Sequence, residues 1–217
     1  MRLVVIINFK TYEQATGKNA VKLAKICEQV AKSSKADIRI AVQPTDLAAV
    51  VKAVKIPVYA QHIDSYSYGK FTGFITAEAV KAAGAKGTLL NHSEHRLKLD
   101  EVEDCVKRAK KLGLVTVLCA NDPLIGQALA TLKPDFIAIE PPELIGGTIS
   151  VSEAEPEVIK DIVKRIGKKE RILVGAGVHT GKDVHVAHQL GAAGVLLASG
   201  VTIAKDPRKV LKNLVSK

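Results

Sequence analysis

The sequence contains no tryptophan, and aromatic residues make up only 4% of its 217 positions. Such a chain has little surface on which the bases of single-stranded nucleic acid could stack. It also lacks finger, RNP and basic-zipper patterns. The formal net charge of +10 fits nucleic acid, an anionic membrane surface or an anionic small molecule as the partner, and nucleic acid becomes the weaker interpretation.

Cysteine is scarce as well, and the spacing of the cysteines argues against a disulfide-stabilised protein and against a metal-binding one. The three cysteines, Cys27, Cys105 and Cys119, are odd in number, far apart and not arranged in metal-binding pairs. We therefore expect no disulfide framework, no metal site and reduced thiols, as in a cytoplasmic protein. With one methionine and no tryptophan, a thermophilic source is a further hypothesis.

Long apolar runs are absent too. No stretch approaches the roughly 20 apolar residues of a transmembrane helix, and the apolar start at 1–10 lacks a signal-peptide cleavage site. The beginning of the chain is therefore interpreted as a buried strand. We expect no association with membranes.

Short runs rich in Val, Ile and Leu alternate with longer helical patterns, which predicts a parallel sheet covered by helices. Eight runs can be placed, at residues 3–9, 38–42, 58–61, 87–91, 115–119, 136–140, 172–175 and 194–198. The clearest helical patterns cover residues 19–31, 77–83, 99–112, 156–166 and 182–190.

Eight strand-helix units in 217 residues leave about 27 residues each, close to the minimum for such a unit. The prediction is a (β/α)8 TIM barrel, an α/β fold forming a single domain over 1–217, with a shortened helix at 124–133. An open doubly wound sheet fits the same alternation. Against it, the chain has neither a G-x-G-x-x-G nor a G-x-x-x-x-G-K-[ST] motif.

In such a barrel the functional groups lie where strands end. Asn8 and Lys10 follow the first run and share one face of the strand, although Lys10 alone could be a surface lysine. His92 follows the fourth run, just before an expected helix start that would favour a neutral imidazole. A histidine bonded only to backbone is the alternative there. His95 and Arg96 are interpreted as residues that form ion pairs on that helix.

The sixth run ends in Glu140, a carboxylate placed to act as a general base. The segment 141–148 that follows has prolines at one end and glycines at the other, which suggests a rigid lid with a hinge, or else an ordinary polar loop. Gly177 follows the seventh run, and Ala198 and Ser199 the eighth. Small residues in both loops would let backbone N–H groups bind a phosphate.

Five motifs along the chain resemble the triosephosphate isomerase family in order and spacing. They are Asn8-Phe9-Lys10, Ala60-Gln61, Phe71-Thr72-Gly73, His92-Ser93-Glu94 with Arg96, and Glu140-Pro141. The similarity runs essentially end to end and is most specific over 59–96.

The resemblance implies an isomerase that interconverts D-glyceraldehyde 3-phosphate and dihydroxyacetone phosphate through an enediolate, in glycolysis and gluconeogenesis, without a cofactor. It implies that Glu140 is the base, His92 the electrophile, Lys10 an electrostatic stabiliser and Asn8 a positioning group. The implied substrate-binding residues further along the chain are Ile145, Gly146, Gly177, Ala198 and Ser199. The implied supporting residues are Glu94, Thr72 and Arg96, and Cys119 would pack near the base.

The trimmed helices resemble the archaeal branch of the family, which implies a homotetramer, with a dimer as the alternative. Thr72 lies in the loop that, in this family, enters the active site of a neighbouring subunit. Several residues differ from the commoner pattern of the family, which affects the lid and the phosphate loops. These are Pro142-Glu143 for Val-Trp, Val174 for Tyr, Gly177 for Ser, and Ala198-Ser199 for two glycines.

Two other functions compete with this one. The chain could be another phosphate-binding barrel enzyme, such as a sugar-phosphate isomerase, epimerase or lyase, because fold and phosphate loops are widely shared. The block His92-Ser93-Glu94 with Arg96 argues against it. The chain could also be a basic nucleic-acid-binding protein, whose affinity would fall steeply with salt.

Overall fold

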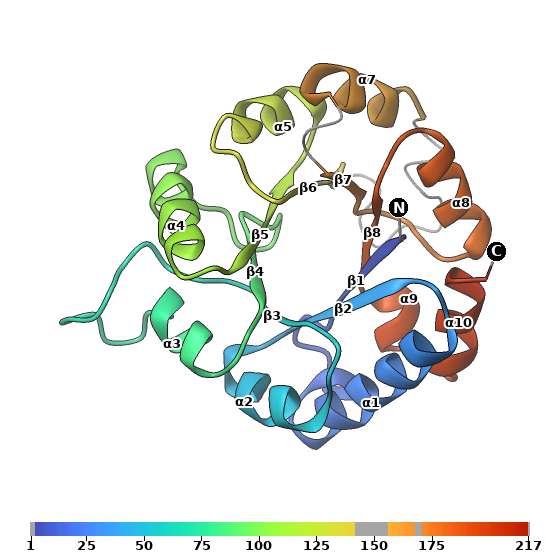
Figure 1. Cartoon of the computed structure of the whole chain (residues 1–217), viewed down its shortest axis with the longest axis horizontal. Coiled ribbons are helices and arrows are strands. Elements are labelled where there is room, and N and C mark those ends of the chain that lie inside the picture. Colours follow the sequence, from blue (N-terminus) through green and yellow to red (C-terminus); the bar gives the residue numbers. More distant parts are fainter. Residues whose placement is uncertain (1–2, 142–155, 168–170, 217) are drawn as a thin grey trace.

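A computed structural model describes residues 3–141, 156–167 and 171–216, and shows a closed barrel of parallel strands ringed by helices (Figure 1). The strands pair in chain order, and the last pairs with the first. They are β1 Val4–Asn8, β2 Asp37–Val42, β3 Val58–Ala60, β4 Gly87–Leu90, β5 Val115–Ala120, β6 Phe136–Ile139, β7 Arg171–Val174 and β8 Gly194–Leu197.

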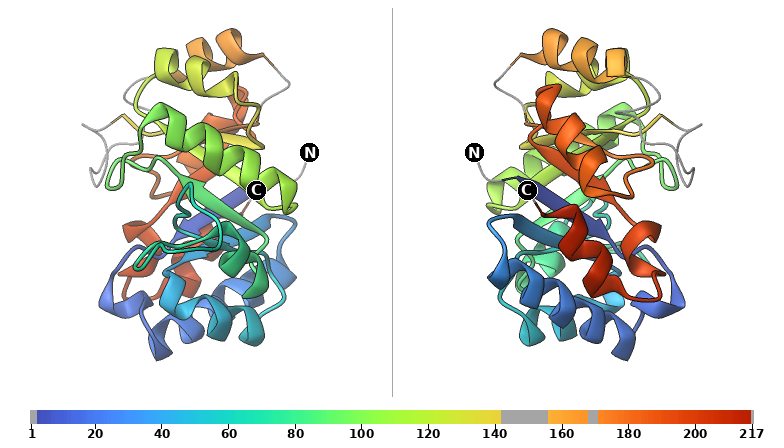
Figure 2. Two further views of the ribbon diagram at one scale, coloured as in Figure 1. Left: turned by 90° about the vertical axis from the view of Figure 1, so that its left-hand side faces the viewer. Right: turned by 90° about the vertical axis from the view of Figure 1, so that its right-hand side faces the viewer.

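All eight predicted strands are therefore present, with ends that differ by at most one residue. The side views of Figure 2 show helices covering the outer face of the barrel. The described helices are η1 Glu13–Ala15, α1 Lys18–Ser33, α2 Pro44–Ala53, α3 Ala77–Ala82, α4 Leu99–Lys111, α5 Pro123–Ala130, α7 Pro156–Ile166, α8 Gly181–Gln189, α9 Ser199–Thr202 and α10 Pro207–Leu214.

The residues at the starts of several helices explain why those helices begin where they do. Proline occupies the first turn of α2, α5 and α10, where its missing N–H costs no hydrogen bond. Asp122 and Asp206 cap α5 and α10 by accepting from backbone N–H groups three residues on. The helix α5 has only eight residues, which confirms the shortened helix expected at 124–133.

The strands are buried on both faces, and alternate side chains serve two separate cores. Outward-facing residues such as Val5 and Ile7 pack against the helices. Inward-facing residues such as Val4 and Ile6 fill the barrel together with side chains from β2 to β8. Because Ile6 points inward, so does Asn8 two residues later, and the alternation thereby sets which strand-end residues can reach the site.

The amino-terminal end of the barrel is filled by an arginine. The guanidinium of Arg39 pairs with the Asp37 carboxylate at 2.6 Å and donates to the Tyr59 hydroxyl. It also lies over the Phe136 ring, 5.1 Å from the ring centre. Burial raises the pKa of Tyr59 to about 12, so its phenol stays protonated. A Cβ on Gly87 would come within 3.0 Å of the Tyr59 ring, so this glycine leaves room for that ring.

Candidate functional site

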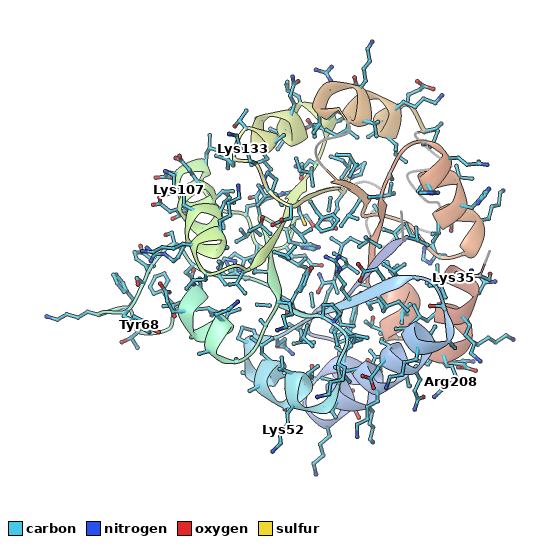
Figure 3. All side chains as sticks on the ribbon, in the orientation of Figure 1. Lys35, Lys52, Tyr68, Lys107, Lys133 and Arg208 are labelled. Atoms are coloured by element: carbon cyan, nitrogen blue, oxygen red, sulfur yellow. The ribbon has the colours of Figure 1, made fainter. Side chains whose placement is uncertain are left out.

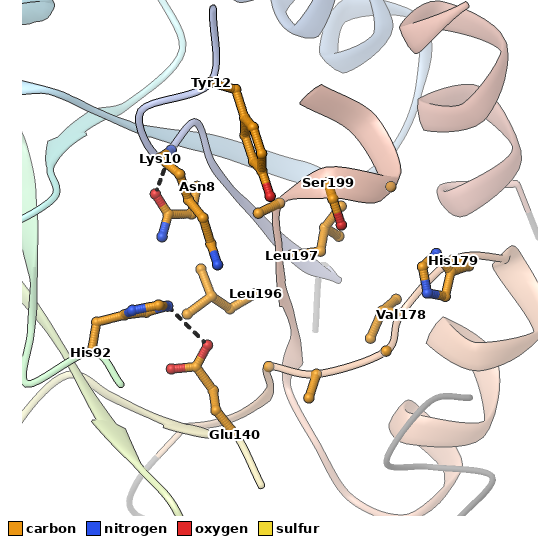
Figure 4. Close-up of a pocket in the computed structure, with 15 residues that line it drawn as sticks. Asn8, Lys10, Tyr12, His92, Glu140, Val178, His179, Leu196, Leu197 and Ser199 are labelled. Atoms are coloured by element: carbon orange, nitrogen blue, oxygen red, sulfur yellow. Dashed lines mark hydrogen bonds and ion pairs between the residues drawn. The ribbon is translucent and has the colours of Figure 1, made fainter. Parts of the chain in front are cut away.

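A pocket lies at the carboxyl ends of the strands, and it collects the residues that follow β1, β4, β6, β7 and β8 (Figure 4). In a barrel of this kind that end carries the variable loops. The lining includes residues that the sequence predicted from separate strand ends. They are Asn8, Lys10, His92, Glu140, Gly177, Ala198 and Ser199.

Glu140 and His92 face each other across the pocket. Glu140 follows β6 and is 3% exposed, and its backbone N–H donates to Ala120 of β5 at 2.8 Å. The Oε1 atom of Glu140 lies 3.4 Å from Nε2 of His92, which is 7% exposed. Among the described residues, Oε2 of Glu140 has no hydrogen-bond partner. This oxygen is shielded from solvent, whereas Oε1 faces the imidazole of His92.

The imidazole of His92 is oriented by the backbone. The N–H of Glu94 donates to Nδ1 of His92 at 3.2 Å, so the lone pair of Nδ1 is occupied. In the neutral ring the proton must then be on Nε2, which is the nitrogen that faces the pocket. His92 is thus a hydrogen-bond donor directed at the space beside Glu140.

Lys10 brings the ammonium group into the same space. Its Nζ lies 2.6 Å from Oε1 of Glu94, and Figure 4 shows its side chain pointing toward His92. Asn8 accepts a hydrogen bond from the backbone N–H of Lys10 at 3.0 Å and another from Gln61 Nε2 at 3.2 Å. Gln61 also donates to the carbonyl of Lys10 at 3.0 Å. These bonds hold Lys10 in a left-handed conformation with φ of 47°.

The segment after β4 forms a turn, so the helix start expected directly after His92 is wrong. The helix α4 begins only at Leu99. Asn91, with φ of 58°, accepts from the N–H of Leu97 at 3.1 Å and donates to the carbonyl of Cys119 at 3.1 Å. These side-chain bonds replace the bonds that a helix would make. The hydrogen bond from the N–H of Glu94, and not a helix end, therefore orients the imidazole.

Arg96 and His95 also differ from the expected helical ion pairs. Arg96 donates to the carbonyl of Asn91 at 2.5 Å and supports the turn from outside the pocket. His95 stacks on the buried ring of His62, with ring centres 4.1 Å apart. Both side chains fix the turn that carries His92.

The two loops expected to bind phosphate lie side by side at the pocket wall. Gly177 adopts φ of 64°, a conformation that favours glycine. Ala198 precedes the short helix α9, which begins at Ser199. A Cβ on Gly200 would come within 3.3 Å of the Val178 carbonyl, so the two loops are in close contact. Backbone groups of both loops can thus approach one anion.

The remaining predicted residues lie elsewhere. Thr72 is exposed in the loop 61–76 and does not line the pocket of its own chain. Ile145 and Gly146, and with them the lid expected at 141–148 beyond Pro141, lie outside the described residues. Cys119 is fully buried, and burial together with the charge of Glu140 holds the pKa of its thiol well above the usual value. It stays protonated beside the carboxylate.

Sequence reasoning missed two pocket residues, Tyr12 and His179. Tyr12 follows the turn at Lys10, where the alternation of a strand no longer applies, so the sequence did not mark it. His179 lies beyond the glycine-containing turn at 175–177, and no pattern in the sequence marked it.

The parts of the chain that the structure describes hold no cluster of three or more His, Cys, Asp or Glu side chains able to bind a metal ion. Over the same residues, no helix is long and apolar enough to cross a bilayer.

The structure is a closed eight-stranded barrel, and a carboxylate, an imidazole and an ammonium group converge at its carboxyl end. These features define an acid-base enzyme of the (β/α)8 class. The family model described as triosephosphate isomerase matches residues 3–215. The proteins named triosephosphate isomerase from Methanobacterium bryantii and Archaeoglobus fulgidus are 51% and 50% identical to the chain. The alignments cover 99% and 98% of this chain, and 96% of each relative.

The chain belongs to the triosephosphate isomerase family. It is an isomerase that acts on triose phosphates, and its reaction is a step of glycolysis. The expectations of a TIM barrel and of this activity are confirmed.

Proposed function

We propose that Glu140, His92 and Lys10 carry out the interconversion of D-glyceraldehyde 3-phosphate and dihydroxyacetone phosphate. The observation that carries the proposal is the 3.4 Å approach of Glu140 Oε1 to His92 Nε2, with Nδ1 held by the N–H of Glu94. A planar enediolate needs a base beside its carbons and a donor beside its oxygens, and this pair supplies both.

In this mechanism Glu140 removes a proton from the carbon next to the carbonyl and returns it to the neighbouring carbon. His92 gives its Nε2 proton to the oxygen on which negative charge develops and takes a proton back from the neighbouring hydroxyl oxygen, so the carbonyl and hydroxyl groups exchange places. Lys10 stabilises that charge, because its ammonium is fixed by Glu94 at 2.6 Å in a largely buried position. Asn8 positions Lys10 through the backbone bond at 3.0 Å. All steps are proton transfers, so no cofactor is needed.

The phosphate group of the substrate would lie against the loops that follow β7 and β8. Backbone N–H groups of Gly177, Ala198 and Ser199 are the proposed donors, with Ile145 and Gly146 contributing from a lid over 141–148. Closure of this lid would exclude water and protect the enediolate from losing phosphate. The net charge of +10 favours the approach of such an anion.

The test is a coupled assay of glyceraldehyde 3-phosphate conversion on the parent protein and on Glu140→Gln. The amide cannot accept the proton, so kcat should fall by roughly 10²- to 10⁴-fold. KM should change far less, because the amide has the shape of the carboxyl group. Gln127→Glu, a charge change at an exposed site on α5, serves as a control and should keep parental kinetics. An inactive parent, or an active Glu140→Gln, would contradict the proposal.

We further propose that the single barrel domain over 1–217 works in the cytoplasm as a homo-oligomer, a tetramer with a dimer as the alternative. The loop 61–76 projects from the barrel, and Tyr68 lies near its tip (Figure 3). Its aromatic rings cluster at the surface, with Tyr66 stacked on Phe71 at 4.3 Å and Phe74 48% exposed. Exposed apolar clusters of this kind are typical of protein interfaces. Thr72 belongs to the same loop.

A further inference from the structure

Tyr12 lines the pocket from the segment after β1, next to the loop that follows β8, because β1 and β8 are paired. Figure 4 shows its ring entering the pocket beside Lys10, with the hydroxyl directed toward Ser199. The hydroxyl thus points toward the loop that follows β8, and Ser199 of that loop lines the same pocket. The proton transfers proposed above make no use of it.

The position of Tyr12 is fixed by its backbone. Its carbonyl accepts from the N–H of Ala15 at 2.9 Å and from the hydroxyl of Thr16 at 2.8 Å. Thr16 in turn accepts from Nε2 of Gln43 at 3.0 Å, which ties the segment to the start of α2. The Tyr12 ring packs against the outer core. A donor held in this way loses little conformational freedom when it binds a ligand.

The electrostatics of the pocket make a neutral donor useful. The ammonium of Lys10 is already paired with Glu94 at 2.6 Å, which offsets part of its charge. A phosphate dianion has many acceptor positions, and the small residues of the loops after β7 and β8 offer mainly backbone N–H groups. A tyrosine hydroxyl is protonated at neutral pH and can donate without adding charge. Across the described chain, the Tyr12 hydroxyl makes no hydrogen bond that would compete for this donor.

We propose that the Tyr12 hydroxyl donates a hydrogen bond to the phosphate group of the substrate and selects phosphorylated trioses over unphosphorylated ones. The inference rests on the proposed function, because it takes the phosphate to lie between the loops after β7 and β8. Tyr12 then completes the phosphate site from the segment after β1, beside the loop that follows β8.

The experiment compares the parent with Tyr12→Phe, which keeps the ring and removes only the hydroxyl. Hydrogen bonds to charged groups are strong enough that KM for glyceraldehyde 3-phosphate should rise roughly tenfold with little change in kcat. The dissociation constant of inorganic phosphate, measured by calorimetry, should rise by a similar factor. The kcat/KM for unphosphorylated D-glyceraldehyde should stay at the parental value. Gln127→Glu, the exposed control on α5, should behave as the parent.

Two results would overturn the proposal. Unchanged KM and phosphate affinity in Tyr12→Phe would show that the hydroxyl does not contact the phosphate. An equal loss with D-glyceraldehyde would show that the hydroxyl supports the site as a whole. Failure of the proposed function is distinguishable, because it would appear in the parent or in Glu140→Gln, whereas phosphate calorimetry does not depend on turnover.

Discussion

At the scale of single residues, the space around Glu140 depends on a neighbour that has no side chain. A Cβ atom on Gly175 would lie 2.3 Å from Cγ of Glu140 and 3.0 Å from its carboxyl carbon. Carbon atoms in contact pack at about 3.5–4.0 Å, so one of the two side chains would have to move. The backbone at both positions is held by strand-to-strand bonds of 2.8 Å. Glu140 would therefore be displaced.

We predict that Gly175→Ala lowers kcat by roughly 10²-fold, because a displacement of about 1 Å can cost that much in an oriented active site. The measurement is kcat per folded molecule, with folding checked by circular dichroism. Gly126→Ala is the matched control, since its Cβ would meet the flexible end of Ile162 at 2.6 Å in the outer core. It should lower the melting temperature and leave kcat intact. Parental kcat in Gly175→Ala would refute the explanation.

Gly175 also shows how much of the site could be predicted from the sequence at the scale of single residues. Small residues after the seventh strand indicated only a close approach of backbone to an anion. That Gly175 also makes room for Glu140 follows from the pairing of β6 with β7, which places Ile139 next to Val174. Strand register depends on how the strands pair in the tertiary structure, and a run of four apolar residues does not specify it.

At the scale of elements, the turn after β4 is joined to the base of the projecting loop. His62 lies just after β3, and its Nε2 is 3.1 Å from Oδ1 of Asp64. The other oxygen of Asp64 accepts from the N–H of Ile75 at 2.6 Å, so Asp64 closes the loop 64–75 at its base. The stacked ring of His95 covers His62 and connects this base to the turn that carries His92.

We predict that His95→Ala lowers the free energy of unfolding by about 1 kcal/mol, the usual contribution of a stacked aromatic pair. It should also lower kcat more than it raises KM, because the turn positions His92. His95→Phe keeps the stack and is expected to restore both quantities. Urea titration and steady-state kinetics measure them. If Ala and Phe variants behaved alike, the stack would have no part in holding the turn.

The elements were predicted well where they are apolar and periodic, as in all eight strands. The helices α2 and α10 were not among the clear patterns, although Pro44 and Pro207 mark their first turns. The turn at 92–98 was mistaken for a helix start because its bonds come from Asn91 and Arg96, which reach backbone groups up to 28 residues away. Such long-range bonds have no periodic signal in the sequence.

At the scale of the whole molecule, the exposed aromatic cluster on the loop 61–76 bears on assembly. Light scattering at micromolar concentration should give a mass near four times the 23.1 kDa of one chain for a tetramer, about 92 kDa. Phe74→Ser should shift the mass downward, because it removes an apolar side chain from the expected contact. Ile203→Ser, at an equally exposed position of 49%, should keep the parental mass. A parent of 23.1 kDa would contradict an oligomer.

The pairing of β8 with β1 has a consequence for the order of synthesis. Val4 lies beside Gly194, and Ile7 beside Leu197, so the strand made first finds one of its two neighbours only when the strand made last has emerged. Asn8 and Lys10 stand at the end of that first strand, while Ala198 and Ser199 follow the last. A nascent chain that has formed seven strands thus already carries Glu140 and His92 but still lacks one wall of the pocket. The pocket should therefore be complete only after β8 has been made and the ring has closed.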